Sequence, residues 1–153
     1  MKKLHPIRPL LSSALLGLVC LSATAADRPA SPVIENAWIR ALPGDLPAAA
    51  YFRMRNSSDG ARRLVGAESS AFAMAMLHQS SDQGGQSQMK RVDGVEVPAH
   101  GSASCAPGSY HLMLMHAQQP LTVGATVPIT LHFDDGSAVA VPFMVKGAAA
   151  SGR

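Results

Sequence analysis

Cysteine is nearly absent from this chain, with Cys20 in an apolar N-terminal segment and Cys105 as the only other one. If the N-terminal segment is removed, Cys105 has no internal disulfide partner. In an oxidising compartment a lone cysteine is buried, metal-bound or vulnerable to oxidation. We expect Cys105 to be buried, because a free cysteine often behaves as a small core side chain.

The chain also lacks a charge excess outside its first residues. It has 13 basic and 10 acidic residues, and three of the basic ones (Lys2, Lys3 and Arg8) precede residue 10, which leaves ten against ten. No basic stripe remains to bind nucleic acid or an anionic membrane. No serine-nucleophile motif, phosphate loop or catalytic carboxylate pair stands out. We therefore do not expect an enzyme.

The first 26 residues are predicted to be a signal peptide. A basic start precedes an apolar run, Leu10 to Leu21, that is short for a bilayer span. Small residues near Ala25 then offer a cleavage site. We expect a soluble periplasmic chain from about Asp27; an uncleaved anchor is the alternative. Lipidation of Cys20 is not expected, because Val19 is larger than the residue usual before a lipid-modified cysteine.

Short apolar runs separated by turn residues predict an all-β sandwich or barrel over residues 27–146, followed by a disordered tail at 147–153. The stretch 69–77 is ambiguous, because Ala, Met and Leu favour helix. The expected strands are Val33–Arg40, Ala48–Asn56, Arg63–Ala67, Ala73–Gln79, Gln88–Val92, Gly94–Val97, Tyr110–His116, Val127–Phe133 and Ala138–Val145.

Two histidines and two methionines stand in one ordered spacing: His78, ten residues, Met89, twenty-one residues, His111, one residue, Met113. A thioether is a soft, neutral ligand that favours Cu(I) over harder metals. His78 and Met89 are symmetric about a predicted turn at 82–85, which would place them opposite each other on a hairpin. Strand alternation puts His111 and Met113 on one face.

This spacing resembles that of the PCu(A)C family of periplasmic copper chaperones, and the resemblance covers nearly the whole exported part. Further matching segments are 49–52, 55–56, 63–67, 107–115, 119–121 and 124–128. The resemblance implies a cupredoxin-like Greek-key fold and a monomer that binds Cu(I) through His78, Met89, His111 and Met113. It also implies delivery of copper to the CuA subunit of cytochrome c oxidase, directly or with a Sco-type thiol protein.

The chain departs from that family in three places. Gln79 replaces a methionine common after the first histidine, but it would point away from the face of His78. His116 stands where glycine is common. The tail after residue 146 lacks the methionines and histidines that build a second, Cu(II) site in some members.

The remaining methionines and histidines have ordinary interpretations. Met54 and Met144 are expected in the core, whereas Met74 and Met76 would share the face of His78, as flanking or packing residues. We expect Met115 to shield the metal. His100 is expected to be exposed, and His132 to make a structural hydrogen bond.

Two other functions compete with the chaperone. Cys105, His111 and Met115 follow the order of a blue-copper electron-transfer site, with His78 as second imidazole. That arrangement leaves Met89 and Met113 unexplained. The other competitor is a β-sandwich scaffold or adhesion module without metal.

Overall fold

The computed structural model describes residues 31–151 and contains ten strands and no helix within that range. No helix in this part of the chain could cross a membrane. The signal peptide and its cleavage site lie outside the described residues. The strands are β1 (Val33–Arg40), β2 (Ala48–Arg55), β3 (Arg62–Glu68), β4 (Phe72–Gln83), β5 (Gln86–Arg91), β6 (Val95–Val97), β7 (Ser102–Cys105), β8 (Tyr110–Ala117), β9 (Thr126–Phe133) and β10 (Ala138–Lys146).

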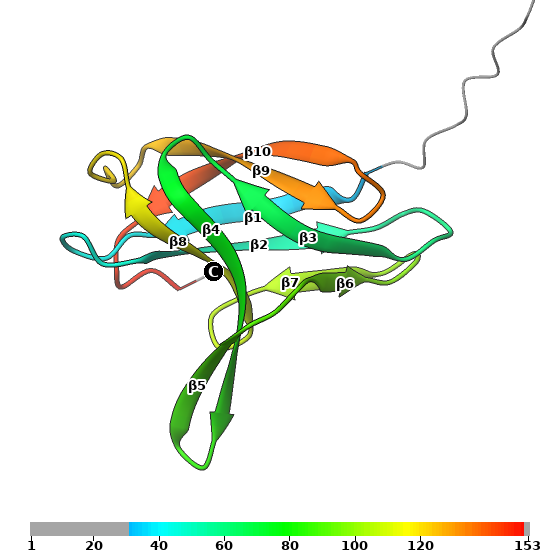
Figure 1. Ribbon diagram of the computed structural model, residues 1–153, viewed down its shortest axis with the longest axis horizontal. Helices are drawn as coiled ribbons and strands as arrows, with labels where there is room; N and C mark the ends of the chain where they lie inside the picture. The colour runs from blue at the N-terminus through cyan, green and yellow to red at the C-terminus, as the bar shows by residue number, and fades with distance from the viewer. Residues whose placement is uncertain (1–30, 152–153) are drawn as a thin grey trace, which may run out of the picture.

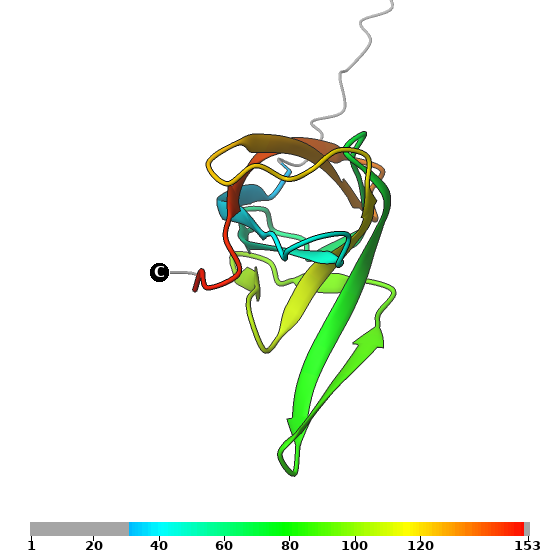
Figure 2. The same cartoon turned by 90° about the vertical axis from the view of Figure 1, so that its left-hand side faces the viewer.

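All ten strands form one curled sheet in the order β5-β4-β8-β7-β2-β1-β10-β9-β3-β6, with β8 also pairing with β2. Strand β1 is parallel to β10, and most other pairs are antiparallel. The sheet bends until β3 contacts β4, so that the strands surround one interior, as Figure 2 shows. The prediction of an all-β sandwich or barrel is confirmed.

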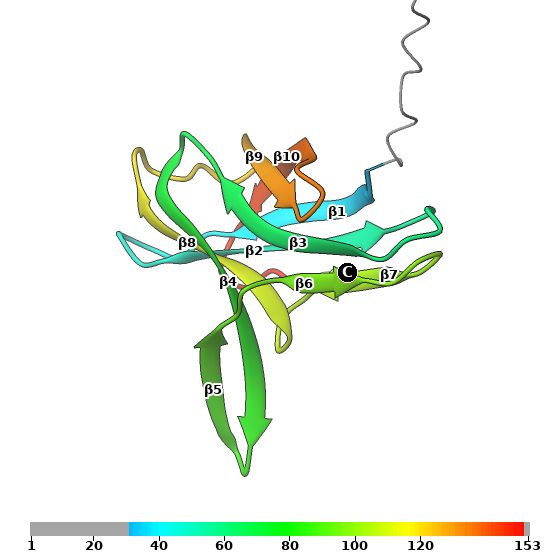
Figure 3. The same cartoon turned by 45° about the vertical axis from the view of Figure 1, so that its right-hand side comes forward.

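The β4–β5 hairpin leaves this body. The far half of β4 and all of β5 project away from the other strands (Figures 1 and 3). Because the hairpin extends beyond the barrel, both of its faces meet solvent over much of its length. A side chain near its base therefore lies at the boundary between the packed body and an open ribbon.

Alternating side chains fill the barrel interior, as period-two strands require. Leu112 and Leu114 of β8 point inward, and Met54 and Cys105 are also buried there, as expected. The largest fully buried apolar side chains are Phe143, Ile39, Met54, Leu64, Leu112, Leu114, Ile129, Leu131, Val97 and Val145.

The nine expected strands are present, all but Val33–Arg40 with shifted ends, and a tenth was missed. Strand β7 lies in a stretch of glycine, serine and alanine that resembles a turn by composition, yet it pairs with β2 along its whole length. The ambiguous stretch 69–77 enters β4 and is not helical. Its alanines and methionines are held extended by pairing with β8, because tertiary pairing overrides helix propensity.

One expectation near the C-terminus differs from the structure. Met144 is 52% exposed, so its assignment to the core was wrong. It pairs with Trp38 and lies on the outer face of β10, because Phe143 and Val145 take the inward positions. The expected tail begins with a turn in which Ala150 N–H donates to the Gly147 carbonyl, and Arg40 donates to the Ala150 carbonyl at 3.1 Å.

Candidate metal centre

The β4–β8 pairing joins the two halves of the His/Met spacing. His78 is the direct cross-strand neighbour of His111, and Met76 is the neighbour of Met113. The two imidazole rings lie 5.8 Å apart between centroids with an interplanar angle of 70°. A metal bound about 2 Å from a ring nitrogen lies about 3 Å from that ring's centroid. One ion can therefore lie between these two rings.

The expected hairpin register was wrong by two residues. Met89 pairs with Ser80, and His78 pairs with Arg91. The two-residue turn is Gly84-Gly85, with φ of 64° and 81°. A tight hairpin turn with positive φ at both positions favours this glycine pair over a turn centred one residue earlier.

Met89 nevertheless stays on the face of His78. Ser80 shares that face because it is two residues from His78, and Met89 is opposite Ser80. Such diagonal neighbours lie about 7–8 Å apart, which a long flexible side chain can span. Met89 is 53% exposed, so its thioether is free to turn toward the imidazoles.

The surroundings of His111 determine which of its ring nitrogens carries the proton. His111 is 3% exposed, and its Nδ1 lies 3.3 Å from the Ser109 carbonyl. Because a carbonyl only accepts hydrogen bonds, Nδ1 carries the proton and Nε2 keeps a lone pair for a metal. Burial lowers the pKa of His111 and outweighs the Ser109 hydrogen bond, which raises it. The neutral, metal-binding form is favoured.

His78 has a ring nitrogen without a protein partner. Its Nδ1 is buried and makes no hydrogen bond. The pKa of His78 is lowered by burial first and then by the positive charge of Arg91. A buried polar atom without a partner is unfavourable, and a metal ion is one partner that would satisfy it.

A metal ion on this face would need methionine sulfur among its ligands. Within residues 31–151, no three His, Cys, Asp or Glu side chains gather to hold a metal. The face offers two neutral imidazoles together with the thioethers of Met89 and Met113, and Met113 is half-buried. Such a set suits a soft monovalent ion and lacks the charged ligands typical of zinc or calcium sites.

Cys105 is separated from this face. Its side chain belongs to the barrel core, and burial raises its pKa to about 12. Its neighbour on β2 is Phe52, which also points inward, whereas His111 lies on the outer face beside Tyr51. A blue-copper centre needs a thiolate beside the imidazoles, and this arrangement places the thiol on the opposite side of the sheet.

An aromatic row continues the site across the outer face, and sequence reasoning did not identify it. The Tyr51 ring lies 6.3 Å from the His111 ring and 4.7 Å from the Trp38 ring. Arg40 and Lys146 cover Trp38 at 5.5 and 5.1 Å, as cation–π contacts. Only the pairing of distant strands brings these residues together, so no local pattern could have revealed the row.

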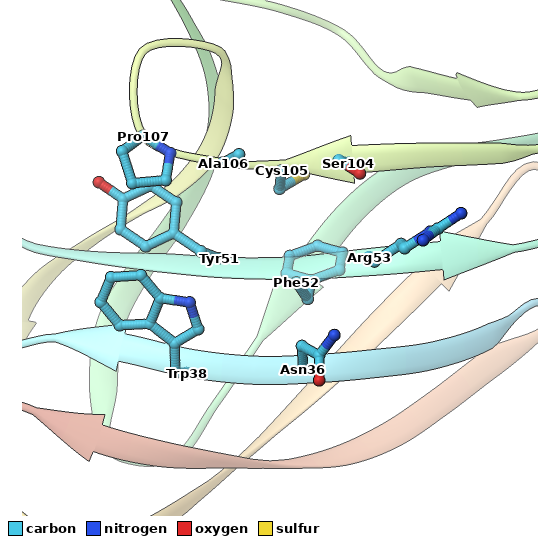
Figure 4. Close-up of a pocket in the computed structure, with 9 residues that line it drawn as sticks. All are labelled: Asn36, Trp38, Tyr51, Phe52, Arg53, Ser104, Cys105, Ala106 and Pro107. Carbon is cyan, nitrogen blue, oxygen red and sulfur yellow. The ribbon is translucent and has the colours of Figure 1, made fainter. Parts of the chain in front are cut away.

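A shallow cavity of about 340 Å³ opens beside this row (Figure 4). Its lining comes from β1, β2 and β7 with the residues that follow β7, and consists of Asn36, Trp38, Tyr51, Phe52, Arg53, Ser104, Cys105, Ala106 and Pro107.

The other histidines are away from the His78–His111 pair. His100 is exposed and lies 2.8 Å from an Asp59 oxygen, and His132 lies 3.3 Å from a Glu68 oxygen. The exposure of His100 agrees with the expectation, whereas His132 has this contact with the Glu68 carboxylate in place of the structural hydrogen bond expected for it. His116 is exposed with a φ of 53°, at the end of β8.

Known proteins resemble this chain in both sequence and fold. Residues 33–145 match the family described as "Putative lipoprotein LpqE-like". The curated protein "Putative lipoprotein Lxx21020" from Leifsonia xyli subsp. xyli (strain CTCB07) is 37% identical over 114 residues, which are 74% of this chain and 68% of the relative.

Solved structures agree with the sequence matches. The solution structure of CuI-DR1885 from Deinococcus radiodurans has a TM-score of 0.64 and 36% identity, covering 86% of this chain and 87% of that chain. The copper-bound PCuAC domain from PmoF2 has a TM-score of 0.63 and 29% identity, covering 74% of this chain and 91% of that domain. The fold is cupredoxin-like, and the chain belongs to the LpqE-like family, which is related to PCuAC domains.

Proposed function

We propose that the protein is an exported Cu(I) carrier that binds the ion through His78, Met89, His111 and Met113. The observation that carries the proposal is the direct pairing of His78 with His111 on the outer face of the sheet, with Met113 and Met89 on the same face. The named copper forms of similar structures, CuI-DR1885 and the PmoF2 domain, support it.

The ligand set explains the choice of oxidation state. Thioethers and neutral imidazoles bring no charge, so the bound ion keeps its single positive charge, and soft sulfur favours Cu(I). Thioethers also need no deprotonation and cannot be joined into a disulfide, which suits an oxidising compartment. The copper is cargo, and the protein performs no reaction on it.

Release is proposed to occur by ligand exchange. Met89 is the most exposed of the four ligands, so an incoming thiolate would displace its sulfur first and the more buried His111 last. The copper stays monovalent throughout, each bond to this protein is replaced by a bond to the acceptor, and the acceptor's thiols release their protons. The proposed acceptor is the CuA subunit of cytochrome c oxidase, directly or through a Sco-type thiol protein.

The protein is proposed to act in the periplasm or at the outer surface of a membrane. The relative and the family are named as lipoproteins, which supports export and raises membrane anchoring as an alternative to a free mature chain. Mass spectrometry of the mature N-terminus distinguishes them: cleavage near Ala26 without lipid supports the free form, and a lipid on Cys20 supports anchoring.

Copper transfer tests the proposal. Protein loaded with one equivalent of Cu(I) is mixed with an apo CuA domain, with and without a reduced Sco-type protein, and the two products are separated and assayed for copper. We expect copper on the acceptor, and less transfer from the His78→Ala/His111→Ala variant because it loads less metal. Retention of all copper by the carrier under both conditions would contradict delivery.

A further inference from the structure

A second group of soft ligands continues from the histidine pair along the β4–β8 ladder. Beyond His78–His111, the next residues on the outer face are Met76 opposite Met113, and then Met74 opposite Met115. Four thioethers therefore occupy two successive cross-strand pairs. The proposed Cu(I) site uses only Met113, so the other three are not ligands in it.

Core packing does not explain these three side chains. The inward positions between them are taken by Leu77, Leu112 and Leu114, which are 4%, 0% and 1% exposed. Met74 is 45% exposed, and Met76 and Met115 are half-buried on the outer face. Neighbouring apolar side chains that remain partly exposed on a surface can mark a binding site.

The spacing allows three sulfurs to meet at one ion. Directly opposed residues have Cβ atoms about 4.5–5.5 Å apart, and diagonal neighbours lie about 7–8 Å apart. Met74 and Met115 are directly opposed, and Met76 is diagonal to Met115. Because methionine has three rotatable side-chain bonds, its sulfur can move several ångströms about its Cβ without a backbone shift.

We propose that Met74, Met76 and Met115 form a second metal site, an all-thioether site for a monovalent soft cation, either Cu(I) or Ag(I). Three neutral sulfur ligands exclude Zn²⁺, Mg²⁺ and Ca²⁺, which take nitrogen, oxygen or thiolate ligands. The site binds more weakly than the His78–His111 site, because it lacks imidazole. It is distinct from the proposed copper site and does not depend on the copper-carrier function.

Silver titration followed by NMR tests the site, with Ag(I) as a probe that is not oxidised during the experiment. The methionine methyl groups are labelled with ¹³C in the full mature chain. We expect two equivalents to bind, the first shifting the methyls of Met89 and Met113 and the second shifting those of Met74, Met76 and Met115. Binding of a single equivalent would overturn the proposal.

Matched variants assign the second equivalent. Met74→Leu/Met115→Leu keeps apolar volume on the same face, and we expect it to bind one equivalent. Met144→Leu is the control, because Met144 is 52% exposed on the same outer face but lies beside Trp38, and this variant is expected to bind two. Two equivalents in the Met74/Met115 variant would contradict the assignment.

A third variant separates this site from the proposed copper site. His78→Ala/His111→Ala is expected to lose the tighter equivalent and to keep the weaker one, with shifts still confined to Met74, Met76 and Met115. Loss of both equivalents in a variant with an unchanged circular dichroism spectrum would show that the thioethers do not bind alone. Loss of neither would contradict the histidine site and leave the thioether site standing.

Discussion

A row of aromatic and imidazole rings, Trp38, Tyr51, His111 and His78, crosses the outer face of the sheet. The β1–β10 half of this face and the β4–β8 half differ in how far other side chains cover them. On β1 and β10, Trp38 is only 5% exposed because Arg40 and Lys146 lie over it. On β4 and β8, the imidazoles and thioethers lie at the base of a projecting hairpin. Met74 and Met89 are about half exposed there.

The difference separates a packed surface from the surface on which copper binding is proposed. Trp38, Tyr51 and His111 lie in a row, and the His111 ring lies 6.3 Å from the Tyr51 ring and 5.8 Å from the His78 ring. A ligand held by packing on one side is positioned before the metal arrives. The open half then supplies flexible thioethers that an acceptor can reach.

Removing His111 is expected to have the largest effect on Cu(I) affinity. His111→Ala deletes a proposed copper ligand that lies between Tyr51 and His78, so we expect Cu(I) affinity to fall by about 100-fold or more, since losing even a residue that orients a ligand costs 10–100-fold. Competition with a Cu(I) chelator measures the loss. His132→Ala removes an imidazole outside the site and should leave affinity unchanged; equal losses in both variants would contradict the assignment.

Acid is expected to weaken Cu(I) binding by protonating His78 and His111. Copper binds the neutral imidazole, and burial, with Arg91 at His78, lowers the pKa of both rings below the usual 6.5. Cu(I) affinity is therefore expected to stay level from pH 8 to about 6.5 and to fall below that. Chelator competition across this range measures it, and a fall that begins above pH 7 would contradict the lowered pKa values.

The lowered pKa values of His78 and His111 also predict how the stability of the metal-free protein changes with pH. A histidine whose pKa is lowered in the folded state binds a proton more tightly in the unfolded chain. The free energy of unfolding therefore decreases as the pH falls through 6.5 and below. Urea denaturation of the metal-free protein at several pH values checks this direction.

Met89 should contribute less than His111, because it is half exposed and diagonal to His78. Met89→Leu removes the sulfur and keeps the volume, and we expect about a tenfold loss of affinity through faster copper release. Stopped-flow transfer to a chelator gives the rate. Met144→Leu is the matched control, with 52% exposure against 53% for Met89. Equal release rates in the two variants would remove Met89 from the site.

Cys105 gives the smallest expected effect on binding. Cys105→Ser should leave Cu(I) affinity unchanged, because the thiol points into the core. It should lower the free energy of unfolding by about 1–3 kcal/mol, the cost of burying a hydroxyl without a partner. Urea denaturation and chelator competition measure the two quantities. A blue Cu(II) complex in the wild type that disappears in this variant would support the electron-transfer alternative.

Much of the fold could be predicted from alternation within single segments. Leu112 and Leu114 alternate with His111 and Met113 in the sequence, and the structure keeps both faces. Strand β7 was missed because its small residues form a strand by pairing with β2, which is distant in sequence. Met144 was misplaced although its alternation with the buried Phe143 and Val145 puts it on the outer face.

The spacing predicted four metal-binding side chains, and the pairings of β4 with β5 and β8 put them on one face of the sheet. The expected hairpin register was wrong, because the turn lies at Gly84-Gly85 and not at the midpoint between His78 and Met89. The pairing of His78 with His111 could not be predicted from sequence, since the two residues are 33 positions apart on strands that are not consecutive. The metal-binding role of the four side chains remains a prediction.

X-ray absorption at the copper edge of protein loaded with one equivalent of Cu(I) shows which atoms bind the ion. We expect nitrogen and sulfur scattering together in the wild type, and loss of the sulfur contribution in Met89→Leu/Met113→Leu. A spectrum with nitrogen or oxygen neighbours alone, or with sulfur that persists unchanged in that variant, would contradict a centre built from His78, Met89, His111 and Met113.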